Sequence, residues 1–352
     1  MLPTPQQVHF EARDRAFRCR RMLVRPEDIQ QAVHSLVLKL NYDLVTEIDL
    51  SKRARVRLGT STTQRCRYCL RSRPETKFSH ESHTIPECLG GHQLISDDEC
   101  DRCNQIFSER FEVHLDRMTR PMRAFLGIKG KRKPPKFETK DKATQLRFLP
   151  DERRYVVLDR PDSKIVKIDE VNKRYTLRLP CEPFSRLEVY RALAKIGFAI
   201  LPPEELPIYE HVRQWLSGIA ATPGGLSIAY AVGNFAFNLS TARRPAIRLW
   251  RRKWRGIPCP RFVVDLVLPR LAFTFPMPPF RGEVGRTNTQ FVLPVPDLSE
   301  QPGWGLTEWS GFDLRKSELE TEFVFTAVMT YETTEAISTE ELLRNSGLSL
   351  PA

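Results

Sequence analysis

Two short cysteine pairs constrain this chain more than any other feature of its sequence. Cys66 and Cys69 form the first pair and Cys100 and Cys103 the second, each with two residues between its cysteines. A pair at this spacing lies on one tight turn, and four thiolates satisfy a tetrahedral zinc ion without an open coordination position. We therefore predict a structural zinc site that clamps the segment between the two pairs.

The cysteine pattern and the N-terminal sequence together indicate the cellular compartment in which the protein is expected. CxxC pairs in a chain that begins without an apolar signal region are typical of metal binding rather than of disulfides. No stretch approaches the roughly eighteen uninterrupted apolar residues of a membrane-spanning helix. We expect a cytoplasmic protein with no membrane partner.

The charge of the chain favours a polyanionic partner. Its 55 Lys and Arg residues exceed its 43 Asp and Glu residues and give a formal net charge of +12. A positive field speeds encounter with nucleic acid whatever its base sequence. Many basic proteins bind no nucleic acid, so the cysteine-rich segment must identify the partner.

A short motif lies between the cysteine pairs. His83 is followed by Pro86 in a His-x-x-Pro pattern, then by Gly90-Gly91, and Asn104 follows the last cysteine directly and opens a predicted helix. The order CxxC, His-x-x-Pro, Gly-Gly, CxxCN resembles bacterial HNH endonucleases of the ββα-metal fold. The resemblance covers about residues 66 to 112 and says little about the rest of the chain.

The resemblance implies specific roles for these residues. His83 would be the general base that deprotonates the attacking water, a task that suits an imidazole because it titrates near neutrality. Asn104 would stand beside a catalytic Mg²⁺ or Mn²⁺, which would stabilise charge on the phosphate and on the leaving oxygen. Zinc on the four cysteines would only hold the scaffold.

One position departs from the family pattern. The residue before the base is usually Asp, Glu or His and ligates the catalytic ion, whereas this chain has Ser82. A hydroxyl is a poor ligand for a hard divalent cation, so Ser82 is a weak candidate, and Glu81 or His80 could substitute. Glu112, eight residues after Asn104, is the nearest carboxylate on the same helical face. It is a candidate ligand, with an exposed helical glutamate as the alternative.

Two basic stretches are candidate nucleic-acid contacts. The first follows the motif and continues to Lys136 without a carboxylate, and a plain solvated face is its alternative. The second alternates with Trp250 and Trp254, as suits phosphate contact with stacking, although a basic structural strand or a protein-binding surface would look similar. The assigned contacts are Arg117, Arg120, Arg123, Lys129, Lys131, Arg132, Lys133, Arg248, Arg251, Arg252 and Lys253.

The periodicity of the chain predicts an α+β protein in three parts. Residues 1–59 read as a basic N-terminal extension with one helix, and residues 60–140 as a ββα-metal HNH module with a structural zinc and a basic tail. Within that module a helix at 107–126 is expected to kink at Pro121. Residues 141–352 read as a mixed α/β sheet domain of unknown role, with helices at 184–201 and 204–218, several strands that suggest an antiparallel sheet, and a short final helix.

The favoured function is metal-dependent hydrolysis of DNA phosphodiester bonds, in restriction, phage defence or a mobile element as the resemblance implies. The alternative is a zinc-dependent nucleic-acid-binding protein that no longer cuts, which Ser82 motivates. RNA is a second candidate substrate. A homodimer, an activating ligand sensed by the C-terminal domain and a defence-system partner are further candidates that no motif supports.

Overall fold

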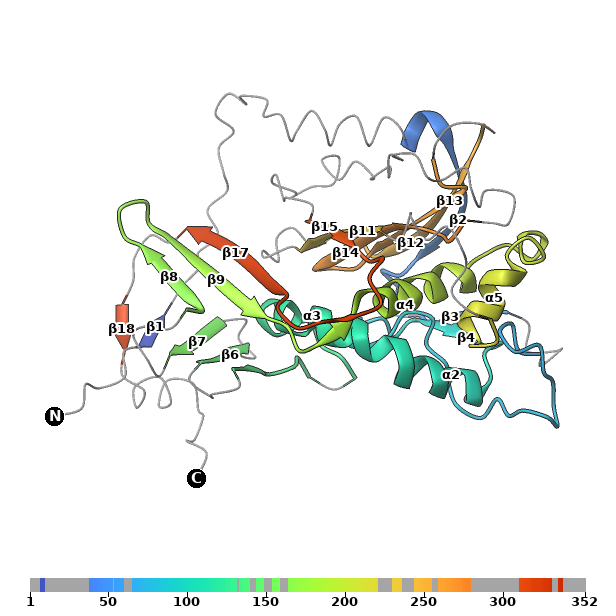
Figure 1. Ribbon diagram of the computed structural model, residues 1–352, viewed down its shortest axis with the longest axis horizontal. Helices are drawn as coiled ribbons and strands as arrows, with labels where there is room; N and C mark the ends of the chain where they lie inside the picture. The colour runs from blue at the N-terminus through green and yellow to red at the C-terminus, as the bar shows by residue number, and fades with distance from the viewer. Residues whose placement is uncertain are drawn as a thin grey trace. The chain divides into compact units, whose positions relative to one another are not determined.

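The computed structural model (Figure 1) forms two compact units, each built from separated parts of the chain. Unit 1 comprises Met1–Arg18, Asp116–Pro183 and Glu320–Ala352, and unit 2 comprises Cys19–Leu115 and Phe184–Leu319. The three expected domains are contiguous, and that division stays a prediction. The structure describes residues 7–9, 38–52, 54–59, 65–131, 133–139, 144–148, 154–158, 164–220, 230–235, 244–254, 259–279, 310–330 and 335–337.

Unit 2 contains a six-stranded sheet in which every described pairing is antiparallel. The order is β15 (Ser310–Asp313), β11 (Tyr230–Phe235), β14 (Leu271–Pro276), β13 (Phe262–Val267), β12 (Ala246–Arg252) and β2 (Tyr42–Asp49). Every residue of β13 and β14 is buried, as their nearly continuous apolar sequences require. The predicted antiparallel sheet is therefore confirmed.

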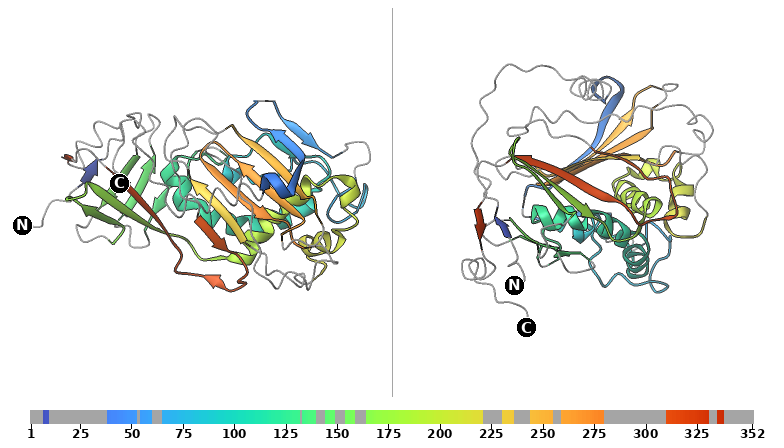
Figure 2. Two further views of the ribbon diagram at one scale, coloured as in Figure 1. Left: turned by 90° about the horizontal axis from the view of Figure 1, so that it is seen from above. Right: turned by 60° about the vertical axis from the view of Figure 1, so that its left-hand side comes forward.

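Helix α4 (Arg186–Ala199) packs on this sheet, as the two views of Figure 2 show. Ser185 caps its N-terminus by accepting a hydrogen bond from Glu188 N. A Cβ atom on Gly197 would lie 2.3 Å from Met277 Sδ and 2.9 Å from Val264 Cγ2. The absence of a side chain at Gly197 thus allows the helix to lie close to the sheet. The 3₁₀ turn η3 (Pro203–Glu205) and helix α5 (Glu210–Leu216) follow α4.

The cysteine-rich segment lies in the same unit. Strand β3 (Val56–Leu58) runs parallel to β4 (Leu94–Ser96), and a bridge joins His83 to Ile95 on β4. The turn η1 (Glu87–Leu89) separates His83 from β4. Cys100 is the N-cap residue of α2 (Asp101–Phe107). The segment therefore combines a short strand pairing with a helix.

The helix continues past α2 with one irregularity. A π turn, η2 (Ser108–Glu112), joins α2 to α3 (Val113–Leu126), and α3 contains Pro121 within its bounds. The helix therefore begins at Asp101, before both Asn104 and the predicted range 107–126, and it contains the π turn η2, while the expected kink at Pro121 stays a prediction. A π turn widens the backbone locally and rotates the residues after it relative to those before it.

Unit 1 contains two further sheets. One has the order β18 (Glu335–Ile337), β1 (Gln7–His9), β7 (Arg154–Leu158), β6 (Thr144–Phe148) and β5 (Phe137–Glu138). The other joins β17 (Val324–Thr330), β9 (Arg174–Pro180) and β8 (Val166–Asp169). The short strands β10 (Phe184–Ser185) and β16 (Leu319–Glu320) complete the described elements.

Some expectations fall outside the described residues. These are most of the N-terminal helix, of which residues 38–41 are described as helical, and the short final helix. No helix in the described part of the chain is both long and apolar enough to cross a membrane.

Candidate metal centre and active site

The four predicted cysteines come together at one point of unit 2. The Sγ atoms of Cys66 and Cys103 lie 3.7 Å apart, as do those of Cys69 and Cys100, and all four lie within 4.8 Å of one another. Zn–S bonds of ~2.3 Å in a tetrahedron place sulfur atoms ~3.8 Å apart. The four thiols therefore fit a zinc ion. Among the described residues they are the one His, Cys, Asp or Glu cluster with this property.

Side chains from outside the segment hold the first cysteine turn. The fully buried ring of Tyr68 packs against Phe107 at 4.6 Å and Phe198 at 5.6 Å between ring centroids. Its main-chain oxygen accepts hydrogen bonds from Arg213 of α5 and from Ser217 Oγ. Helices α4 and α5 thus support the metal site, although the sequence placed them in another domain.

His83 lies on a strand segment that pairs with β4. Thr84 N donates to Leu94 O at 3.0 Å, and Ser96 N donates to Ser82 O at 2.8 Å. The imidazole is 18% exposed, and its Nδ1 is buried without a hydrogen-bond partner in the described structure. Nε2 is therefore the nitrogen available for chemistry. Burial lowers the pKa of His83 below its ordinary 6.5, and the carboxylate of Glu87 opposes this shift.

His92 lies beside His83, a neighbour that sequence reasoning missed. Glu87 Oε1 is 3.4 Å from His83 Nε2 and 3.6 Å from His92 Nδ1, and the two imidazole centroids are 5.9 Å apart. The position of His92 after Gly90-Gly91, which turn the chain back toward β4, is the signal that could have identified it.

The residues around Ser82 are engaged within the protein. Ser82 is 1% exposed, and its hydroxyl donates to Glu99 O at 3.3 Å. Glu81 is exposed and accepts a hydrogen bond from Arg55 Nη1 at 2.5 Å. His80, the other substitute, contributes its main-chain N–H to Asp101. None of these contacts places a ligand for a catalytic ion beside His83.

Asn104 lies on α2 and faces a different space. It lines an open hollow of about 610 Å³ together with His80, Asp101 and Ser108. His83 is not among the lining residues of that hollow. The hollow that Asn104 lines therefore does not include His83.

Glu112 belongs to a buried charge cluster. Its Oε1 lies 3.2 Å from Lys195 Nζ, and Glu99 Oε2 lies 3.3 Å from the same nitrogen. Lys195 Nζ also donates to His83 O at 2.9 Å. Burial raises the pKa of Glu99 to about 7, although Lys195 opposes this shift. Sequence reasoning missed Lys195, whose signal was a lysine within the apolar run of α4.

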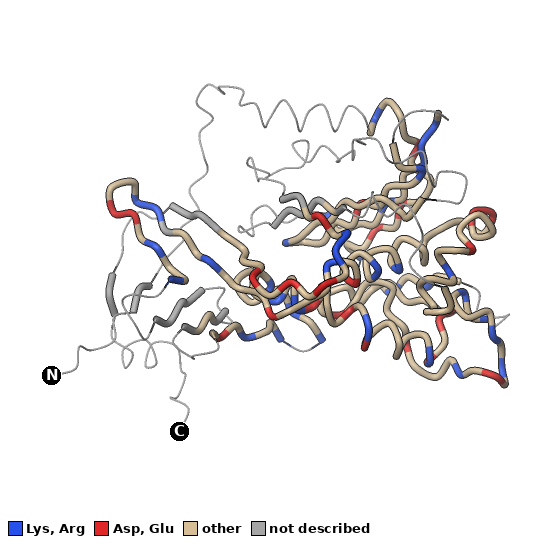
Figure 3. Tube along the Cα trace, in the orientation of Figure 1, with Lys and Arg blue, Asp and Glu red and all other residues tan. Residues whose placement is uncertain are grey.

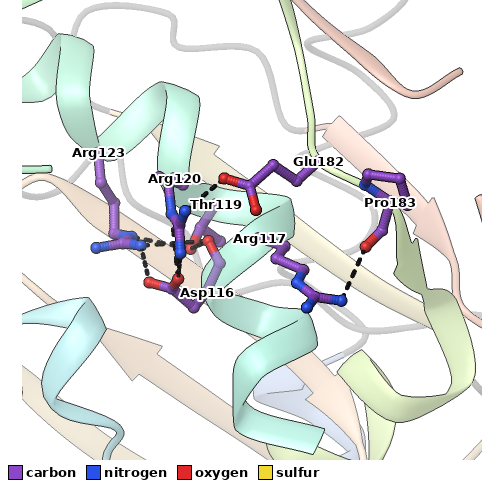
Figure 4. Close-up of polar contacts among 7 residues, drawn as sticks. All are labelled: Asp116, Arg117, Thr119, Arg120, Arg123, Glu182 and Pro183. Carbon is purple, nitrogen blue, oxygen red and sulfur yellow. Dashed lines mark hydrogen bonds and ion pairs between the residues drawn. The ribbon is translucent and has the colours of Figure 1, made fainter. Parts of the chain in front are cut away.

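The first basic stretch is partly tied up inside unit 1 (Figure 4). Arg117 donates to Pro183 O at 3.3 Å, and Arg120 forms ion pairs with Asp116 and Glu182. Arg123 is 2% exposed and forms an ion pair with Asp116. By contrast, the later cations Lys129, Lys131 and Lys133 are exposed, and Arg132 lies outside the described residues.

The second basic stretch lies beside carboxylates in unit 2. Figure 3 shows acidic and basic positions interspersed along the described trace. Each assigned cation of this stretch has a partner within the protein: Arg248 pairs with Glu47 and Asp265, Arg251 with Glu205, and Lys253 with Asp43, while Arg252 donates to Cys259 O. A phosphate here would compete with these contacts.

Comparison with known proteins identifies the cysteine-rich segment. Residues 66–120 match the family model described as HNH endonuclease. Neither the search of curated proteins nor that of solved structures returns a match. The matched range includes the four clustered cysteines, the strand that carries His83 and the helix that carries Asn104. Residues 66–120 are therefore similar to the HNH endonuclease family, and the match does not extend to the rest of the chain.

Proposed function

We propose that the protein is a metal-dependent endonuclease that hydrolyses DNA phosphodiester bonds with His83 as its general base. The observation that carries the proposal is the position of His83. Within an HNH-matched segment it is held on a strand paired with β4, with one ring nitrogen sealed off and the other available. The hydrolysis of a phosphodiester by water needs a base of this kind at neutral pH.

In this proposal each group has one task. Nε2 of His83 takes a proton from water, whose oxygen attacks phosphorus while the bond to the leaving oxygen breaks. Glu87, 3.4 Å away, stabilises the imidazolium that forms. The four cysteines hold zinc and keep the strand and the helix α2 in place.

The ligands of a catalytic ion are the weakest part of the expected site. HNH resemblance implies Mg²⁺ or Mn²⁺, which would stabilise the developing charge on phosphate. However, the Ser82 hydroxyl is buried on Glu99 O, Glu112 contacts Lys195, and Asn104 lines a separate hollow. These three residues do not form one donor set, so no step is derived from a bound ion.

The test is cleavage of supercoiled plasmid with Mg²⁺ or Mn²⁺ by the wild type and by His83→Ala, both shown by metal analysis to contain zinc. We expect nicking or linearisation that His83→Ala loses. His211→Ala is the matched control, because His211 lies on α5 and bonds Pro279 O. Equal cleavage by His83→Ala would refute the assigned base.

The alternative function is a zinc-dependent nucleic-acid-binding protein that does not cut. The observation that favours it is the buried Ser82 at the usual ligand position. Such a protein would bind DNA with strong salt dependence and show no cleavage with any divalent ion. The expected defence role, cytoplasmic location, homodimer and activating ligand stay predictions.

A further inference from the structure

A lysine outside the HNH-matched segment contacts the main chain of the candidate base. Lys195 is on α4, in a helix whose residues from Val189 to Ala199 are all buried. Its side chain is fully buried, within unit 2. Burial of an ammonium raises the free energy of the folded state unless several oxygens surround the charge. The contacts of Lys195 therefore indicate its role.

Three oxygens from three separate parts of the matched segment surround Nζ. They are His83 O at 2.9 Å, Glu112 Oε1 at 3.2 Å and Glu99 Oε2 at 3.3 Å. The ring of Phe107 adds a cation–π contact at 5.7 Å. One side chain of α4 therefore contacts His83, Glu99 directly before the N-cap residue Cys100, and Glu112 at the end of η2.

The bond to His83 O bears on catalysis because it fixes the backbone that carries the imidazole. The ammonium donates hydrogen bonds to His83 O and to Glu112 Oε1, while Glu99 Oε2 at 3.3 Å is an ion-pair partner. The strand around His83 has few other main-chain bonds, since its pairing with β4 is short. A displacement of ~1 Å at a reacting group costs on the order of 100-fold in rate.

We propose that Lys195 is a positioning residue for the general base, so that α4 is an integral part of the nuclease. The proposal rests on the proposed function of His83. Lys195 touches neither substrate nor reacting atoms, and it acts through the main chain of His83. Its exchange should therefore change kcat and leave KM nearly unchanged.

The competing explanation is that the cluster only stabilises the fold. Lys195→Met alone would not separate the two, since it leaves two carboxylates buried without their cation. The combined variant Lys195→Met, Glu99→Gln, Glu112→Gln removes all three charges with little change in volume, which preserves the fold far better. The control Arg191→Met, Glu188→Gln neutralises another pair on α4, whose members do not contact His83.

For zinc-loaded protein that melts near the wild-type temperature, we expect the combined variant to lose about 10-fold to 100-fold in kcat at an unchanged KM. The control should cleave at the wild-type rate. A combined variant with wild-type kcat would overturn the proposal and leave Lys195 a purely structural role.

A second readout separates this proposal from the nuclease assignment. Hydrogen–deuterium exchange of residues 82–86 should be faster in the combined variant than in the control, with exchange in α2 unchanged. Equal exchange in the two would overturn the positioning role. A wild type that does not cleave, with exchange faster as expected, would refute the nuclease and support Lys195 as the residue that orders this strand.

Discussion

The Sγ atoms of Cys66 and Cys103 lie 3.7 Å apart although the two residues are 37 positions apart in the sequence. Together with the equal distance between Cys69 and Cys100, this places four thiols at tetrahedral spacing. We expect one zinc per chain by elemental analysis.

Removal of one ligand tests this site. Cys100→Ser should lose the zinc and the cooperative thermal transition of unit 2, because a structural zinc contributes on the order of 10 kcal/mol to folding in small domains. Cys88→Ser is the control, since Cys88 is outside the cluster. A variant Cys100→Ser that keeps both zinc and melting temperature would contradict the assignment.

The pH dependence of cleavage should reveal the burial of His83. Its lowered pKa keeps the imidazole neutral at more acidic pH, so the acid limb of kcat/KM should lie below the ordinary value of 6.5. Glu87→Gln removes a charge that raises this pKa and should move the limb to lower pH still. Initial rates from about pH 5 to about pH 8 measure the position of this limb. An acid limb above 6.5 would contradict the lowered pKa of His83.

Gly90 and Gly91 should differ in what they tolerate. A Cβ on Gly91 would lie 2.4 Å from Ile85 Cγ2, within a fully buried contact, so Gly91→Ala should lose about 1–3 kcal/mol of unfolding free energy. Gly90 has φ 84°, a left-handed conformation that asparagine also adopts. Gly90→Asn should therefore be milder than Gly91→Asn in urea denaturation, and the reverse order would show that space does not limit Gly91.

The first basic stretch should divide into structural and DNA-binding cations. Arg123→Ala removes a buried guanidinium from its ion pair with Asp116, which keeps Arg120 as a partner, and should cost about 1–3 kcal/mol of stability. Lys129→Ala and Lys133→Ala should leave stability unchanged and each lower the slope of log K against log salt by about 1. Thermal melts and DNA titrations at several salt concentrations measure both, and an unchanged slope would remove these lysines from the DNA surface.

Local patterns predicted the parts of the site that are local in sequence. The cysteine spacing identified the metal cluster, and short runs rich in apolar residues identified β12, β13 and β14. Both follow from backbone geometry within a few residues.

Contacts between distant residues could not be predicted in this way. The pairing of β2 with β12 and the contact of Lys195 with His83 O depend on the whole fold. For the same reason sequence reasoning missed His92, whose relation to His83 depends on the turn between them. Arg117, Arg120 and Arg123 were among the residues assigned to DNA from the sequence, and their internal partners became visible only in the folded chain.

The pairing of β2 with β12 also affects when unit 2 can be completed during synthesis. Asp49 faces Ala246 across this pair, so a ribosome must add about two hundred residues before the early strand finds its neighbour. Residues 66–120 emerge well ahead of α4, and long-range pairing of this kind slows folding. We therefore expect a newly made chain to show none of the proposed cleavage of nucleic acid until most of its length has been synthesised.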